Sequence, residues 1–258
     1  VIFENIALEK ISNSMFSGCS ALSSIALPDS VTEIEKYAFF ETGLRNIQLP
    51  EKLTLIGAYA FCNCKNLEQV QLPSQLKELG NGAFSSCENL TQIQLPSQLN
   101  KLGGDAFRDC TSLDKIDIPA GLKQIESGTF CNTGLTSVTL HEGLTKIEDW
   151  AYHDCLKLKK IRIPKSVTNI GGLALGIRYN RENGAEEVIP GGFTVEGYTG
   201  SAAERYVKRM HQSENLYHVF FKDVKFVSIG GQTAAVTNIS KTKISALKTR
   251  AFTGKPLT

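Results

Sequence analysis

The chain has 258 residues, of which 41% are hydrophobic and 21% are charged, and its formal net charge is +2. These values are typical of a folded globular protein, and they give no net field that would select nucleic acid or an anionic membrane surface. No apolar run approaches the ~20 residues that a membrane-spanning helix needs. Val1 stands within a repeating pattern and follows no leader, so we expect a piece of a longer protein whose signal and anchor lie outside it.

A pattern of 22 or 23 residues recurs along most of the chain. Two neighbouring copies are nearly identical: LEQVQLPSQLKELGNGAFSSCEN and LTQIQLPSQLNKLGGDAFRDCTS. The first leucine of the unit recurs at Leu22, Leu44, Leu67, Leu90, Leu113, Leu135 and Leu158. Repetition at this period predicts stacked units, each of which buries its apolar face only against its neighbours.

Each unit opens with a short alternating stretch, as in Leu67, Val70 and Leu72. This alternation predicts a strand with one buried face. Proline follows the stretch in every unit except one, where His141 replaces it, and proline ends a strand because it has no N–H to donate. The strands of successive units are therefore expected to run parallel.

The remaining apolar columns predict the return side of each coil. Two aliphatic columns follow the strand, and an aromatic column closes the unit at Phe39, Phe61, Phe84, Phe107, Phe130 and Tyr152. Phe16 and Leu175 mark where this column starts and stops. We therefore predict a repeat solenoid of seven or eight coils over residues 1–175, with short parallel strands and 22–23 residues per coil.

The full pattern, L-x-x-I-x-L-P-x-x-L-x-x-I-x-x-x-A-F-x-x-C-x-x-L, resembles the BspA-like class of leucine-rich repeats. The resemblance covers residues 1–175. It implies a curved, right-handed leucine-rich repeat coil in a bacterial protein that is secreted or held at the cell surface. It also implies protein binding or adhesion rather than catalysis.

The residues that follow the array are expected to close it. The polar, glycine-rich stretch 176–192 predicts a loop, and residues 193–198 predict a strand. Ser201 is expected to be the N-cap of a helix, with Glu204 completing a capping box. Because an open solenoid end needs an atypical terminal unit, we assign residues 176–222 to a C-terminal cap of strand and helix.

The last residues are expected to form a third part. A short strand is predicted at residues 217–221, within the cap, and further short strands are predicted at residues 225–229 and 234–239. The tail, KISALKTRAFTGKPLT, is similar to the opening of bacterial immunoglobulin-like surface modules. Residues 223–258 are therefore predicted to be a strand-rich linker or the start of a following module.

Five of the seven cysteines share one column, three residues after the aromatic residue: Cys19, Cys64, Cys87, Cys110 and Cys155. Thr42 and Thr133 take this position in two other units, so we expect small buried residues and free thiols rather than disulfides. Cys62 and Cys131 lie three coils apart, too far for a disulfide. The chain has no C-x-x-C motif and no histidine cluster, so we predict neither a metal site nor a cofactor.

Catalysis is not expected either. The sequence places no serine or cysteine nucleophile beside a histidine and an acid, and a solenoid rarely forms the closed, dry pocket that such chemistry requires.

The residues that flank the central aliphatic residue of each strand are expected to point away from the core. They form two columns, of which the candidate ligand-binding residues are Gln48, Gln69, Gln71, Gln92, Gln94, Lys115, Asp117, Lys160 and Arg162. The amides can bind a peptide or a glycan. The alternative is an amide ladder, in which stacked glutamines satisfy one another between coils, and we prefer this alternative because duplication alone would copy glutamine.

The last coils carry a basic cluster made of Lys157, Lys159, Lys160, Arg162 and Lys165. Such a cluster can bind an acidic polysaccharide or a partner's carboxylates, but we prefer to interpret it as solvated surface. Few aromatic residues lie between these charges, so nucleic-acid binding is not expected.

The first functional hypothesis is a non-enzymatic surface or secreted module, a monomer without membrane insertion, that binds a protein or glycan. The second is a structural spacer that presents neighbouring modules. The third is a targeting module for an enzyme located elsewhere in the parent protein.

Overall fold

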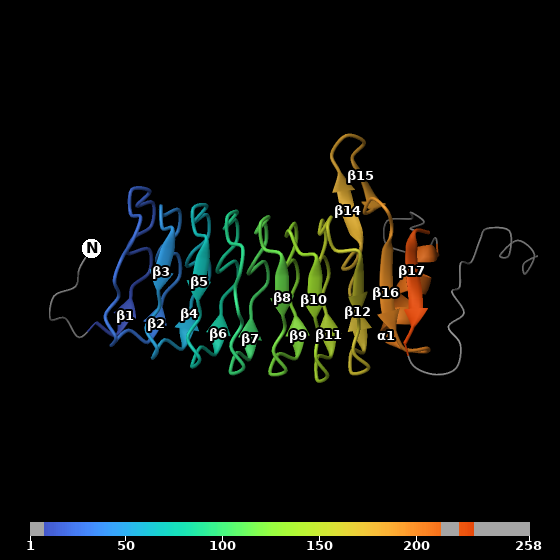
Figure 1. Ribbon diagram of the computed structural model, residues 1–258, viewed down its shortest axis with the longest axis horizontal. Coiled ribbons are helices and arrows are strands. Elements are labelled where there is room, and N and C mark those ends of the chain that lie inside the picture. Colours follow the sequence, from blue (N-terminus) through green and yellow to red (C-terminus); the bar gives the residue numbers. More distant parts are fainter. Residues whose placement is uncertain (1–7, 213–221, 230–258) are drawn as a thin grey trace, which may run out of the picture.

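The computed structural model describes residues 8–212 and 222–229 and shows one elongated stack of coils that ends in a strand and helix cap (Figure 1). Two rows of short strands run along the stack, one on each side of the coils. The strands are β1 (Lys10–Ile11), β2 (Glu33–Ile34), β3 (Asn46–Gln48), β4 (Leu55–Ile56), β5 (Gln69–Gln71), β6 (Glu78–Leu79), β7 (Lys101–Leu102), β8 (Lys115–Asp117), β9 (Gln124–Ile125), β10 (Ser137–Thr139), β11 (Lys146–Ile147), β12 (Lys160–Arg162), β13 (Asn169–Ile170), β14 (Ile177–Asn180), β15 (Ala185–Val188), β16 (Phe193–Gly197) and β17 (Val224–Ser228), and the helix is α1 (Ala202–His211).

The predicted strands form the first row, which contains β3, β5, β8, β10 and β12. Neighbouring coils pair in parallel, for example β3 with β5 and β10 with β8, as the repeat predicts. In the units around Ile25 and Ile93 the pairing is reduced to single bridges, Ala26 to Gln48 and Gln69 to Gln92. Wherever these strands pair, the spacing of the repeat sets their register.

The second row consists of two-residue strands on the return side of the coils, where the sequence predicted no strand. β1, β2, β4, β6 and β7 form one parallel sheet, and β9, β11 and β13 form another. Backbone bonds also join the coils at the aromatic residue, because the Phe61 N–H donates to the Ala83 carbonyl and the Phe84 N–H donates to the Ala106 carbonyl, both at 2.8 Å. The coils are thus hydrogen-bonded to one another at several points around each turn.

The predicted aromatic column is the centre of the core. Its rings stack along the array with centroid separations between 5.1 Å (Phe39 to Phe61) and 5.7 Å (Phe84 to Phe107), and the phenylalanines from Phe39 to Phe130 are fully buried. Phe16 begins the stack and Tyr152 ends it, and the next residue of the column, Leu175, is also buried. Each ring fills space that a single coil cannot fill alone.

The cysteine column is buried as predicted from Cys64 onwards. The thiols of Cys64, Cys87 and Cys110 donate to carbonyls of the preceding coil, 25 or 26 residues earlier, and all seven cysteines are free. Cys19 differs, because it is exposed and not buried as expected. Among the described residues, the Cys19 thiol has no carbonyl partner of the kind that the Cys64 thiol has.

We therefore expect one fast-reacting thiol in the folded 258-residue chain. Burial raises the pKa of the Cys64 thiol to about 11 and raises the pKa of Cys87, so these thiols stay protonated and unreactive until the chain unfolds. Kinetics of labelling with a thiol reagent should show one fast equivalent, which Cys19→Ser removes, and six slow ones. Rapid labelling of several thiols in the folded Cys19→Ser chain would contradict this burial.

The stretch 176–192 is not the predicted loop but contains an antiparallel hairpin, β14 and β15. The strands are held by an ion pair of 2.8 Å between Arg178 Nη2 and Glu187 Oε2. The turn ends at Gly184, whose φ of +68° is a left-handed conformation that glycine adopts without strain. The loop prediction was wrong because polar residues, which are typical of loops, here pair with one another across the two strands.

The cap continues the first row of strands. As predicted, residues 193–198 and 225–229 contain strands: β16 pairs in parallel with β12, and β17 pairs in parallel with β16. The boundary predicted at residue 223 therefore cuts through one sheet, since β17 belongs with the cap. The other predicted strands, at residues 217–221 and 234–239, and the tail that resembles an immunoglobulin-like module lie outside the described residues.

The helix starts after Ser201 as predicted, but the capping box is only half formed. The Glu204 carboxylate accepts the N–H of Gly200 at 2.6 Å, one residue earlier than expected, while the Ser201 hydroxyl is buried without a hydrogen-bond partner. Glu204 also pairs with Lys208 at 2.8 Å. Ala203, Tyr206 and the other apolar residues of α1 are buried under the last coil. No helix in the described residues is long and apolar enough to span a bilayer.

Candidate ligand-binding face

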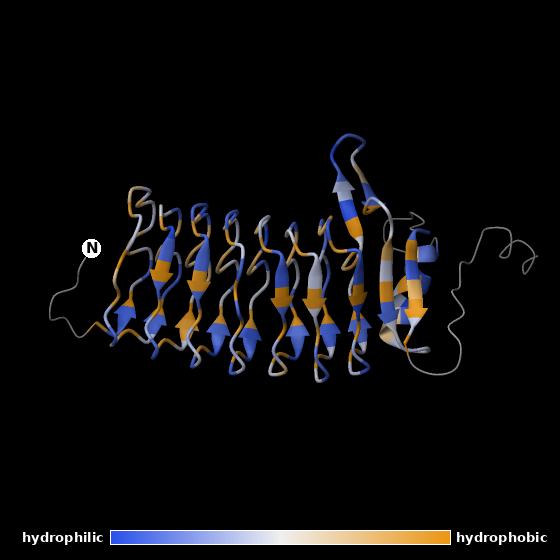
Figure 2. Ribbon diagram, in the orientation of Figure 1, coloured by the Kyte–Doolittle hydropathy of each residue, from blue (hydrophilic) through white to orange (hydrophobic). Residues whose placement is uncertain are grey.

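The outer side of the first row of strands, which we call the strand face, contains every candidate residue that the sequence analysis named. β3, β5, β8 and β12 each have a buried central residue between two exposed ones. Figure 2 shows hydrophilic and hydrophobic residues together within these strands. Because successive side chains of a strand point to opposite sides, each of these strands contributes one side chain to the core and two to solvent.

The parallel register brings the candidate amides into two columns. In one column Asn46 faces Gln69, and a bridge joins Gln69 to Gln92. In the other column Gln48 faces Gln71. Adjacent strands in a sheet lie about 4.8 Å apart, so neighbouring amides repeat at that interval along the array.

These glutamine side chains have no hydrogen-bond partners in the part of the chain that the structure describes. Gln48, Gln69, Gln71, Gln92 and Gln94 are all exposed, and none of their amides donates to or accepts from another described group. The preferred amide ladder is therefore not formed. Ordering long exposed side chains costs conformational entropy, and water satisfies the same groups without that cost.

Charged residues of the strand face lie nearer the cap, and most of them are paired. Asp117 Oδ1 is 2.7 Å from His141 Nε2, the histidine that replaces the column proline. Arg162 Nε is 3.2 Å from Glu196 Oε2, and Lys160 Nζ is 3.9 Å from the other oxygen of the same carboxylate. Lys115, which is exposed, faces Ser137 of the next strand.

The basic cluster expected at the last coils is therefore partly neutralised. Glu196 lies on β16 opposite Arg162 on β12, and its carboxylate forms ion pairs with both Lys160 and Arg162. Lys159 Nζ donates to the carbonyls of Leu156 and Pro190, at 2.8 and 2.7 Å. The contact of Glu196 could not be predicted from the repeat, because the inserted hairpin puts Glu196 34 residues from Arg162, outside the spacing of the repeat.

The strand face is thus neutral in its middle and of mixed charge at the cap end. Free amides offer both donors and acceptors, so the middle can hydrogen-bond a peptide backbone or sugar hydroxyls. Since the middle carries no charge, such binding is expected to depend weakly on salt.

A solenoid of 22- and 23-residue coils, with parallel strands and an apolar column between coils, defines a leucine-rich repeat protein. The pattern of the BspA type leucine rich repeat region, in six copies, matches residues 2–114 and 100–177. The chain therefore belongs to the BspA-type leucine-rich repeat family.

Solved structures of bacterial leucine-rich repeat proteins are similar to this chain. A leucine-rich repeat protein from Bacteroides ovatus is 26% identical with a TM-score of 0.60, and the match covers 72% of this chain and 52% of that one. The leucine rich repeat protein of T. pallidum is 30% identical with a TM-score of 0.58, covering 60% of this chain and 74% of that one. A leucine rich cell surface protein from Faecalibacterium prausnitzii is 29% identical with a TM-score of 0.46, covering 66% and 54%.

The chain thus spans about half the length of the Bacteroides protein, 52% of it. A comparison with curated protein sequences finds no significant match.

Proposed function

We propose that this chain is a non-catalytic binding module of a bacterial cell-surface or secreted protein, and that it binds a protein or glycan through the strand face. The observation that carries the proposal is the pair of exposed amide columns on β3 and β5, which continues at Gln92 and Gln94. These amides are in register and have no partner among the described residues.

Affinity on such a face comes from many weak contacts. A single exposed hydrogen bond contributes only about 0.5–1.5 kcal/mol, because each new contact replaces one with water. An extended ligand that follows the coils can satisfy several amides at the cost of one association event, so the contacts add along the array. An extended peptide or a glycan chain is therefore favoured over a small molecule as the ligand.

The unpaired amides of the strand face favour a binding role over a purely structural one. A spacer needs the buried column and the coil-to-coil hydrogen bonds, but it does not need unpaired amides at regular spacing. The spacer remains the second candidate function, and a role as targeting module for a larger surface enzyme is the third.

The test is a variant in which Gln69, Gln71, Gln92 and Gln94 are all replaced by serine. We expect it to lose at least tenfold in affinity for the ligand of the wild-type chain, identified on arrays of glycans and matrix proteins, while its melting temperature stays within a few degrees. Substitution of exposed side chains away from packing sites typically changes the free energy of unfolding by about 0.5 kcal/mol or less.

The matched control is Gln75→Ser with Gln98→Ser, because these two exposed glutamines follow the strands and lie outside the strand face. The control should bind as the wild type does. If the four-glutamine variant also binds unchanged, or if the wild-type chain binds nothing on either array, the strand face is not a binding site and the spacer role is favoured.

A further inference from the structure

Residues 22 or 23 positions apart in the sequence are neighbours in this solenoid, and one such pair brings a thiol beside an imidazole. Cys131 and His153 each follow the aromatic residue of their coil, so they lie one coil apart. Asp154 is next to His153 in the chain. One ligand atom from each of these three residues lies within 4.8 Å of the others.

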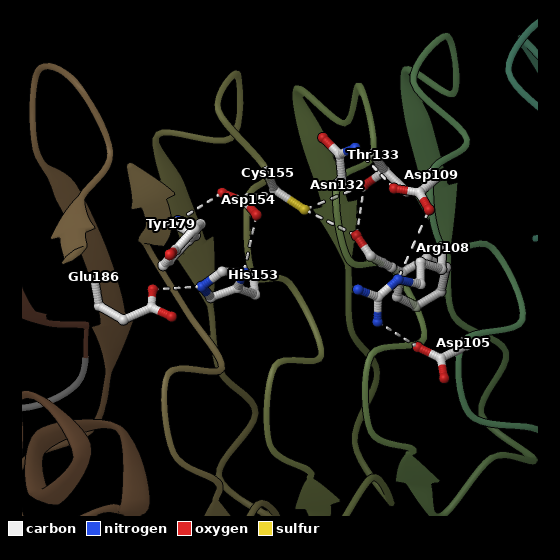
Figure 3. A network of polar contacts seen from close by, with 11 residues as sticks. Asp105, Arg108, Asp109, Asn132, Thr133, His153, Asp154, Cys155, Tyr179 and Glu186 are labelled. Carbon is white, nitrogen blue, oxygen red and sulfur yellow. Dashed lines mark hydrogen bonds and ion pairs between the residues drawn. The ribbon is translucent and has the colours of Figure 1, made fainter. Parts of the chain in front are cut away.

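The side chains of His153 and Asp154 are held in place from several sides (Figure 3). His153 Nε2 is 2.7 Å from Glu186 Oε2, and His153 Nδ1 is 3.2 Å from Asp154 Oδ2. The other oxygen of Asp154 accepts the backbone N–H of Tyr179 at 2.9 Å. Glu186 and Tyr179 belong to the hairpin β15 and β14, so the hairpin completes the cluster from outside the array. Cys131 is 5% and His153 is 6% exposed.

This arrangement requires a positive charge. If the Nε2–H of His153 donates to Glu186, then Nδ1 and the Asp154 oxygen are two acceptors facing each other at 3.2 Å. Either a proton or a metal ion has to lie between them. The Cys131 sulfur also interacts with the His153 imidazole, so a metal ion in this position can bind all three groups together.

We propose that Cys131 Sγ, His153 Nδ1 and Asp154 Oδ2 bind one Zn²⁺ ion, with a solvent molecule in the fourth position. Thiolate, imidazole and carboxylate together are a ligand set that zinc prefers. Nitrogen and oxygen ligands bonded at about 2.0–2.1 Å in a tetrahedron are separated by about 3.3 Å, close to the 3.2 Å between Nδ1 and Oδ2. Glu186 then accepts the remaining N–H of the histidine, as carboxylates commonly do behind zinc-bound histidines.

A cationic side chain of the same column lies beside Cys131. Arg108 precedes Cys131 by one coil, and its positive charge interacts with the Cys131 sulfur. Arg108 is oriented by Asp105 and Asp109, at 3.2 and 3.7 Å. A cation beside the sulfur would interact favourably with a metal-bound cysteine, because a metal binds cysteine as the thiolate.

A zinc ion here would join three parts of the chain: the coil of Cys131, the coil of His153 and, through Glu186, the hairpin. The site lies where the regular array ends and the cap begins. We therefore infer a structural ion that fixes this junction, since ion binding to the folded state alone raises its stability.

The experiment uses the 258-residue chain with Cys19→Ser in every sample, because Cys19 is the exposed thiol. After treatment with a chelator, the chain is titrated with Co²⁺. We expect saturation at one ion per chain, with a thiolate-to-cobalt charge-transfer band and the strong visible bands of tetrahedral cobalt. Cys131→Ser should abolish the charge-transfer band.

The matched control is Cys155→Thr, which removes a buried thiol from the same region but leaves the three ligands. Threonine takes the corresponding position at Thr42 and Thr133, so this variant is expected to fold and to keep the full cobalt spectrum. Glu186→Gln should weaken Zn²⁺ binding about 10–100-fold. In the wild type, Zn²⁺ should raise the melting temperature above that of the chelated chain.

The proposal is overturned if the wild type gives no charge-transfer band, if the band survives Cys131→Ser, or if Zn²⁺ leaves the melting temperature unchanged. A band that survives Cys131→Ser would mean that another cysteine binds the cobalt, and either of the other two results would mean that a proton closes the cluster. His153 would then be an imidazolium paired with Asp154 and Glu186.

Discussion

Replacing Phe84 with alanine is expected to lower the free energy of unfolding by about 3–5 kcal/mol. Phe84 is fully buried and stacks between Phe61 and Phe107, with ring centroids 5.2 and 5.7 Å away. The substitution removes apolar contacts and leaves a cavity between three coils, and the lost stacking adds about 0.5–1.5 kcal/mol for each aromatic pair. Urea unfolding followed by circular dichroism measures the loss.

The matched control is Phe40→Ala. Phe40 directly follows Phe39 in the chain but is only half-buried and lies outside the central column. Its truncation should cost clearly less than that of Phe84. Equal losses for the two variants would mean that the aromatic column is not the main source of stability.

The Phe84 variant also tests how far the coils unfold together. Stability in a solenoid is approximately a sum of coil terms and interface terms, so a weak interface in the middle can divide the array. The only tryptophan, Trp150, lies three coils beyond Phe84 and reports on the cap side. If Phe84→Ala uncouples the two sides, tryptophan fluorescence will change at a higher urea concentration than circular dichroism does.

The sequence predicts most of the array because every coil must place the same kinds of residue against its neighbours. Val70 and Ile116 could be assigned to the inner side of strands, and Phe84 to the core, from spacing alone. The exposed position of Gln69 and Gln71 follows from the same alternation. Their lack of hydrogen bonds does not follow, because it depends on side-chain conformations that a repeat pattern does not specify.

Contacts between a coil and the hairpin or the cap could not be predicted from the spacing of the repeat. Glu196 reaches Arg162, and Glu186 reaches His153, only because a hairpin is inserted between the last coil and the cap. Cys131 and His153 lie 22 residues apart in the sequence. Local motifs such as C-x-x-C or clustered histidines do not include ligands that are one coil apart. In a solenoid, a separation of 22 residues is the signal that would have found this pair.

Removing the Tyr206 hydroxyl is expected to weaken the contact between the cap and the last coil. The hydroxyl accepts the N–H of Leu175 and donates to the carbonyl of the same residue, both at 2.9 Å. Burial raises the pKa of Tyr206, so the hydroxyl keeps the proton that it donates. Leu175 is the last residue of the aromatic column, and α1 therefore closes the open end of the array at that position.

Tyr206→Phe leaves a buried backbone donor and a buried acceptor without partners, so we expect a loss of about 2–6 kcal/mol, at about 1–3 kcal/mol for each group. Tyr152→Phe is the matched control with the opposite expectation. The Tyr152 hydroxyl is buried and has no hydrogen-bond partner among the described residues, so its removal should be neutral or stabilise the fold. Urea unfolding measures the change in stability of both variants, and hydrogen exchange at the Leu175 amide reports whether the contact with the cap is lost. If the two substitutions have the same effect, the paired hydroxyl of Tyr206 does not hold the cap, and apolar burial of α1 alone closes the array.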